Sequence, residues 1–151
     1  MNILAIIAVA AAIIGLIVAV SLATWVGKAD EGNDRMKEIA GYIREGAMAF
    51  LTREYKIMAI VIVVLALLIG FSLQSVTTAI LYVFGALLSV LAGFFGMKVA
   101  TLGNVRTANA AQESGMNKAL KIAFRSGAVM GLAVSGLGLF GLGIVLCVLD
   151  L

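Results

Sequence analysis

The sequence predicts an all-α membrane protein with four transmembrane helices, several of which extend into the cytoplasm. Of the 151 residues, 63% are hydrophobic and 13% are charged. Soluble domains contain about 45–50% apolar and about 25% charged residues. The apolar excess is concentrated in three runs without charge, which are Met1–Gly27, Ile57–Met97 and Ser126–Leu149.

The lengths of these runs set the number of spans. At a rise of about 1.5 Å per residue, the first and last runs form helices roughly 40 Å and 36 Å long, enough to cross a hydrocarbon core of about 30 Å. The middle run has room for about two spans of roughly 20 residues each. We therefore expect one polytopic membrane segment over residues 1–151, with spans at about 3–26, 57–73, 76–97 and 126–149.

A polar segment, Lys28–Lys56, follows the first run and contains basic and acidic residues in equal number. Asn33 or Asp34 can cap a helix at its start. The apolar residues that follow recur at steps of three and four, as on one side of an α-helix: Met36, Ile39, Ile43, Ala47 and Phe50/Leu51. Since the chain contains no proline, we expect one continuous helix from about Arg35 to Leu73, whose first half stands out of the bilayer.

The remaining elements follow from turn signals. Phe71–Thr78 is a short uncharged turn, and the next helix should cover about Val76–Gln112, again extending beyond the membrane. The pair Ser114 and Gly115 indicates a turn. We expect Ser114 to cap the last helix, Met116–Leu149.

The placement of the basic residues predicts the orientation. All 11 Lys and Arg residues lie in Lys28–Lys56 or in a second polar segment, Gly96–Gly131. Cytoplasmic segments of membrane proteins carry an excess of Lys and Arg. Both polar segments should therefore face the cytoplasm of a multi-pass protein of the cell membrane, with the N and C termini outside. Trp25, near the end of the first run, suits the membrane–water interface.

Four basic residues of the second polar segment form a candidate anion site: Arg106, Lys118, Lys121 and Arg125. They could attract a polyphosphate or another anionic substrate. The simpler explanation is topology and contact with lipid headgroups, because a juxtamembrane Lys or Arg gains about 1 kcal/mol near an anionic leaflet. No GxxxxGK[ST] phosphate-binding loop is present, so we favour the simpler explanation.

The acidic residues of Lys28–Lys56 are candidate Mg²⁺ ligands. A cation site needs converging oxygen ligands, whereas these carboxylates alternate with bases, so surface ion pairs such as Arg35 with Glu38 and Arg44 with Glu45 explain them better. The chain has no His. No ionisable residue lies in the middle of a span, where such residues mark ion pathways. We therefore predict no catalytic, cofactor-binding or metal-binding residue in this chain.

Small residues predict where the helices pack. Gly127 and Gly131 form a GxxxG pair in the fourth span, and Gly93 and Gly96 give the third span a similar face. Further small residues follow the pair along the fourth span: Ser135, Gly136, Gly138, Gly141 and Gly143. Such residues let membrane helices approach closely. We expect the fourth span to pack through these small residues, so that Gly131→Leu would impair packing.

Two segments resemble a known family. Gly41–Lys56, GYIREGAMAFLTREYK, is similar to the I-x-x-GA-x-AFL-x-REYK segment of the membrane-integral, ion-pumping inorganic pyrophosphatases. Gly96–Gly131 resembles the next cytoplasmic segment of that family, through NVRTA at 104–108, KAL at 118–120 and AFRSGAVMG at 123–131. The resemblance covers nearly the whole chain, although the first span matches only in being apolar.

The resemblance implies a homodimeric pump that hydrolyses pyrophosphate with Mg²⁺ and moves Na⁺ or H⁺ out of the cytoplasm, with K⁺ required by some members. The family's catalytic carboxylates and lysines lie on later helices and have no counterpart here. The chain would then be an N-terminal scaffold portion, inactive alone, whose partners are the remaining helices of the pump, a second subunit and the bilayer, and not nucleic acid. The alternative is a small non-enzymatic four-helix membrane protein, such as a transporter subunit or an assembly factor.

Overall fold

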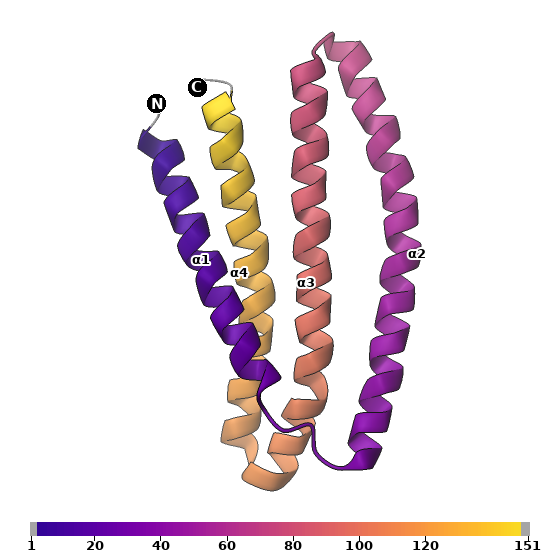
Figure 1. Ribbon diagram of the computed structural model, residues 1–151, viewed down its shortest axis with the longest axis vertical. Helices are drawn as coiled ribbons and strands as arrows, with labels where there is room; N and C mark the ends of the chain where they lie inside the picture. The colour runs from indigo at the N-terminus through magenta and orange to yellow at the C-terminus, as the bar shows by residue number, and fades with distance from the viewer. Residues whose placement is uncertain (1–2, 149–151) are drawn as a thin grey trace.

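The computed structural model describes residues 3–148 and consists of four long α-helices (Figure 1). They are α1 (Ile3–Gly27), α2 (Asp34–Leu73), α3 (Val76–Ser114) and α4 (Met116–Val148). Each helix is long and apolar enough to cross a membrane, and residues 3–148 contain no β-strand. The predicted fold class, an all-α membrane protein with four spanning helices, is confirmed.

The helix ends lie close to the predicted ones because local side chains fix them. Asn33 caps α2, and its side-chain oxygen accepts a hydrogen bond from the backbone N–H of Met36 at 2.9 Å. From there α2 runs without a break to Leu73. Gln74, in the left-handed conformation at φ 47°, and Ser75 form the turn to α3. The hydroxyl of Ser75 caps α3.

The predicted cap of α4 is wrong. Ser114 is the last residue of α3, and Gly115, at φ 81°, connects the two helices. The carbonyl oxygen of Gly115 accepts a hydrogen bond from the N–H of Ala119 at 3.3 Å, so glycine precedes the first turn of α4. A positive φ costs a residue with a Cβ more than it costs glycine, which explains why glycine and not serine holds this position.

The helices form an open row and not a closed bundle. α4 packs between α1 and α3, and α2 lies against the other side of α3 (Figure 1). Among the described residues, α2 makes no packing contact with α1 or α4. The turn from α2 to α3 lies at the end of the molecule where α1 begins and α4 finishes (Figure 1). The two polar segments predicted from the sequence therefore meet at the opposite end, which we call the base.

The seam between α1 and α4 follows a spacing of seven residues. The buried residues of α1 are Ala5, Ala12, Ala19 and Val26. α4 opposes them in antiparallel order with Gly143, Gly136, Val129 and Ile122. A seven-residue repeat keeps the same side of each helix turned toward its partner along the whole seam.

Two glycines bring the backbones of α1 and α4 close together. A Cβ added at Gly136 would lie 2.9 Å from Leu16 Cγ, and one added at Gly143 would lie 2.5 Å from Val9 Cγ2. Carbonyl oxygens of α1 are also within 3.4 Å of both positions. The seam therefore has no room for a larger residue at either glycine.

The predicted contact pair of α4 is wrong. A Cβ added at Gly127 or Gly131 would meet no described atom within 4 Å outside its own helix turn. The predicted packing through the later small residues of α4 is confirmed at Gly136, Gly141 and Gly143, where an added Cβ would lie within 3 Å of a neighbouring helix. On α3 the prediction is confirmed, because a Cβ at Gly96 would lie 2.7 Å from Met130 Cγ on α4 and one at Gly93 would lie 3.6 Å from Tyr55 Oη on α2.

Candidate functional site

Arg106 of α3 occupies the centre of the base. Its side chain is 8% exposed. Its Nε donates to the carbonyl oxygen of Ala29 at 2.9 Å, and Nη1 donates to that of Leu102 at 2.8 Å. Its Nη2 donates to the carbonyl oxygen of Gly27 at 3.0 Å and lies 2.9 Å from Glu31 Oε1. A guanidinium has five N–H donors, so Arg106 is largely satisfied by protein groups.

These contacts attach the end of α1 to α3. The last carbonyls of a helix have no partner inside the helix, and the helix dipole favours a positive charge there. Arg106 meets both conditions, because its guanidinium binds two carbonyl oxygens at or just beyond the end of α1. Arg106 therefore caps α1 from a neighbouring helix.

The loop between α1 and α2, residues 28–33, is fixed by the same part of α3. Asn109, one helical turn after Arg106, donates from Nδ2 to the carbonyl oxygen of Asp30 at 3.4 Å. The N–H of Gly32 donates to Asp30 Oδ1 at 3.0 Å. Gly32 has φ 86°, and a Cβ there would lie 2.7 Å from Asn109 Oδ1. Both the backbone conformation and the close approach of Asn109 require glycine.

Glu31 connects this loop to α2. Its Oε1 lies between the guanidinium of Arg106 and that of Arg44, whose Nη2 is 3.8 Å away. The predicted pair of Arg44 with Glu45 does not form among the described residues, since neighbours in sequence point to different sides of a helix. The predicted pair of Arg35 with Glu38 is confirmed, with Nη1 and Oε2 2.7 Å apart on the surface.

The structure divides the predicted anion cluster. Arg106 is turned inward onto α1, and the other three basic residues lie on α4. Arg125 stacks on Trp25, with its guanidinium carbon 3.9 Å from the ring centre. Lys118 Nζ donates to Ser114 Oγ at 3.2 Å, and Lys121 is exposed. Arg106 therefore lies apart from Lys121 and Arg125, although it lines one cavity together with Lys118.

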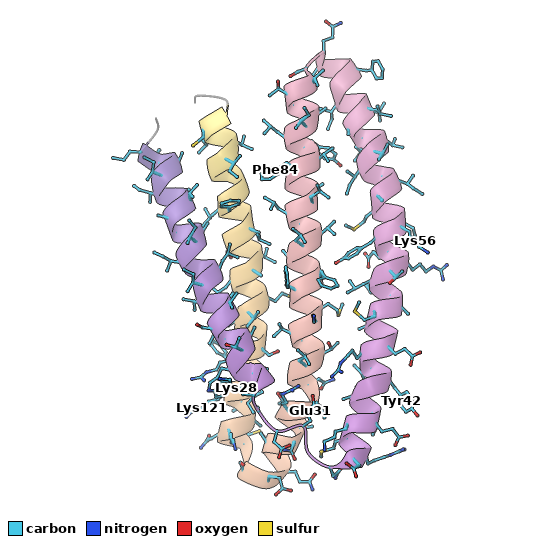
Figure 2. All side chains as sticks on the ribbon, in the orientation of Figure 1. Lys28, Glu31, Tyr42, Lys56, Phe84 and Lys121 are labelled. Atoms are coloured by element: carbon cyan, nitrogen blue, oxygen red, sulfur yellow. The ribbon has the colours of Figure 1, made fainter. Side chains whose placement is uncertain are left out.

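A cavity of about 560 Å³ opens at the base between the α1–α2 loop, α3 and α4. Charged side chains of both signs line it: Lys28, Asp30, Arg106, Glu113 and Lys118. Figure 2 shows Lys28 and Glu31 at this end of the molecule. Because the acidic groups offset the lysines, the cavity does not select strongly for an anion.

The acidic residues do not fit a catalytic metal ion. Among residues 3–148 there is no group of three or more His, Cys, Asp or Glu that could hold one. Mg²⁺ prefers several converging oxygen ligands, whereas Glu31 is bound to Arg106 and Asp30 to the N–H of Gly32. No step of a metal-dependent reaction is therefore assigned to these residues.

The structural role of Arg106 differs from the role expected from the sequence, although the sequence contains a signal for it. Ala92, Val99 and Arg106 are buried at a spacing of seven residues along α3. An arginine that takes the next position of an apolar series is expected to be buried and hydrogen-bonded, because an unpaired buried charge is costly. The partner could not be found, since the end of α1 reaches Arg106 only in the fold.

The fold and the base define a multi-pass membrane protein with a buried structural arginine and without a metal cluster in its described part. Comparison with known proteins then identifies the family. Residues 13–151 match the family described as inorganic H⁺ pyrophosphatase. The chain belongs to this family, which confirms the resemblance seen in the sequence.

Relatives support the assignment. A Clostridium tetani protein, whose name refers to a pyrophosphate-energized sodium pump, is 50% identical over 82% of this chain and 18% of its own length. A K⁺-insensitive pyrophosphate-energized proton pump of Methanosarcina mazei is 48% identical over 87% of the chain and 20% of its own length. A K⁺-stimulated pyrophosphate-energized sodium pump of Thermotoga maritima is 46% identical over 76% and 16%. The chain spans about a fifth of the length of these relatives.

Proposed function

We propose that this chain is the N-terminal scaffold of a pyrophosphate-energized cation pump, which couples hydrolysis of Mg²⁺-pyrophosphate to export of Na⁺ or H⁺. The observation that carries the proposal is the family match over residues 13–151. Identities near 50% to both sodium and proton pumps support it. The names of the relatives include both K⁺-stimulated and K⁺-insensitive pumps, so K⁺ is a candidate activator of the parent protein.

Within such a pump, this chain supports the structure and does not carry the chemistry. The buried cation of the base, Arg106, is bound to backbone carbonyls and Glu31. The expected spans contain no ionisable residue that could pass a cation. Hydrolysis and ion transfer then belong to the rest of the parent protein, and residues 1–151 alone are inactive.

The proposal includes a topology. The spans lie at about 3–26, 57–73, 76–97 and 126–149, and the base faces the cytoplasm, because it carries the Lys and Arg residues. The bilayer, the remaining helices of the pump and a second subunit are the proposed partners. In a Cys147→Ser background, a cysteine placed at Ser75 should react with a membrane-impermeant maleimide added to intact cells. Reaction only after permeabilisation would reverse the orientation.

The test of function uses the complete reading frame that contains this chain. Membrane vesicles from cells that express it should hydrolyse pyrophosphate when Mg²⁺ is present and should accumulate Na⁺ or H⁺. Vesicles that contain residues 1–151 alone, and empty-vector vesicles, should do neither. Hydrolysis by residues 1–151 alone would contradict the scaffold role. An inactive complete protein would instead favour a non-enzymatic membrane protein.

A further inference from the structure

A second group of basic residues lies on α1 and α4, apart from Arg106. We call it the α1–α4 basic face, formed by Lys28, Lys118, Lys121 and Arg125. On α4 its members are separated by three and four residues, so they project from one side of the helix. Lys28 directly follows α1 and lines the same cavity as Lys118. Figure 2 shows Lys28 and Lys121 at the base of the α1–α4 pair.

The cations of this face form no ion pair within residues 3–148, although Asp30 and Glu113 line the same cavity as Lys28 and Lys118. The four ion pairs of the described chain involve Arg35, Lys37, Arg44 and Arg106, and none involves the α1–α4 basic face. Like charges three or four residues apart on a helix repel each other, as Lys121 does with both Lys118 and Arg125. An anion held between them would relieve this repulsion.

The depth of the face suits a lipid headgroup. Arg125 immediately precedes the expected fourth span, and it stacks on Trp25, which is 40% exposed near the end of the first span. Tryptophan is enriched at the membrane–water interface. Lys121 and Lys118 follow about 6 Å and about 10 Å further out along α4. The cations therefore stand at and just beyond the level where phosphate groups of the bilayer lie.

Apolar surface continues from this face into the membrane. Val18, seven residues before Trp25 and on the same side of α1, is exposed. Leu139, fourteen residues after Arg125 and on the same side of α4, is exposed as well. A phospholipid whose phosphate binds near Arg125 could therefore place its acyl chains against this apolar surface of α1 and α4.

We propose that the α1–α4 basic face binds the headgroup of an anionic phospholipid, with Arg125 and Lys121 as its main phosphate ligands and Trp25 as the interfacial contact. Free phosphate and pyrophosphate offer the same oxygen chemistry. The position beside the membrane and the apolar surface next to it favour the lipid. This site goes beyond the proposed function, because it does not require pyrophosphate hydrolysis.

The experiment places the complete protein in nanodiscs of phosphatidylcholine and adds increasing fractions of phosphatidylglycerol. The melting temperature should rise and level off as the anionic lipid increases. In the double variant Lys121→Gln/Arg125→Gln the half-saturating fraction should increase about 30-fold, because each juxtamembrane cation contributes about a factor of five near anionic lipid. The single variant Lys121→Gln, at an exposed position, should show about a fivefold increase.

The matched control is Arg53→Gln/Lys56→Gln on α2. It removes two cations equally close to an expected span but without a neighbouring tryptophan. General attraction to the anionic leaflet acts on both pairs of cations, so the control should raise the half-saturating fraction less than Lys121→Gln/Arg125→Gln does. An unchanged response in both Lys121 variants, or an equal loss in the control, would overturn the proposal. A rise produced as well by pyrophosphate in pure phosphatidylcholine, and lost in Lys121→Gln, would assign the face to free phosphates instead.

Discussion

α1 and α2 are both long apolar helices, yet they are held in the protein in very different ways. α1 buries a residue every seven positions against α4, and Arg106 binds the carbonyl oxygens at its end. α2 is the longer helix but buries only Ala40 and Leu51, and none of its most apolar 18-residue stretch is buried. Length and hydropathy therefore do not decide which membrane helix is firmly packed.

The difference teaches that small residues and buried polar contacts hold α1, α4 and α3 together as one closely packed unit, which we call the three-helix unit. On the side of α4 that meets α3, Ser126 donates to the carbonyl oxygen of Val99 at 3.1 Å in a buried position. The corresponding hydrogen bond between α2 and α3 is made by the Tyr55 hydroxyl, which donates to the carbonyl oxygen of Val90 at 3.1 Å. Changes in the three-helix unit should therefore cost more than changes along α2.

Arg106→Ala should have the largest effect. It removes a buried guanidinium that binds three carbonyl oxygens and Glu31, and each buried acceptor left without a partner costs about 1–3 kcal/mol. The melting temperature of the detergent-solubilised complete protein should fall sharply. Arg35→Ala breaks an exposed pair and should cost only about 0.3–0.5 kcal/mol. Equal losses in the two variants would contradict the role given to Arg106.

Gly136→Leu should follow, since the new side chain would be forced into Leu16 of α1, whose Cγ lies 2.9 Å from the added Cβ. Overpacking of this kind costs about 1–3 kcal/mol. The matched control is Gly131→Leu on the same helix, where a Cβ meets no described atom within 4 Å. Melting of the complete protein should be lowered by the first substitution and retained in the second. An unchanged melting temperature in Gly136→Leu would show that the α1–α4 seam is not closely packed.

Gly32→Ala should destabilise by about 1–3 kcal/mol, because φ 86° and the nearby Asn109 oxygen both oppose a Cβ. Gly41→Ala is the control, and it should stabilise the protein and not destabilise it. Gly41 lies within α2 with open space around it, and alanine favours a helix by up to about 1 kcal/mol over glycine. Thermal melting of both variants checks the prediction. A stabilising Gly32→Ala would exclude the loop conformation described for residues 28–33.

Tyr55→Phe should have the smallest effect. It removes one hydrogen bond between α2 and α3, worth about 0.5–1.5 kcal/mol, and leaves the ring in place. In Tyr42→Phe the lost partner is the exposed Glu38 carboxylate, so this control should be close to neutral. If Tyr55→Phe lowered the melting temperature as much as Arg106→Ala, the contrast between α2 and the three-helix unit would fail.

The sequence predicted the helices well because their ends depend on neighbouring residues. Asn33 binds the N–H of Met36 three positions away, and such a cap can be recognised without the fold. The packing face of α4 could not be recognised in the same way. The sequence predicted packing through Gly127, Gly131, Gly136 and Gly143 alike. Only the pairing of α1 with α4 shows that Gly136 and Gly143 meet α1, whereas Gly127 and Gly131 do not.

The candidate site shows the same limit. The sequence grouped Arg106 with Lys118, Lys121 and Arg125 because all four are basic and near each other along the chain. The fold turns Arg106 toward Gly27 and Ala29, nearly eighty residues earlier. Its structural role depends on that long-range contact.

The central claim is that the base built around Arg106 supports the structure and does not bind the substrate. The most direct test is Arg106→Gln in the complete protein, with the melting temperature and the KM for Mg²⁺-pyrophosphate measured on the same preparation. We predict a lower melting temperature and an unchanged KM. A raised KM at an unchanged melting temperature would contradict the claim and place Arg106 at a substrate site.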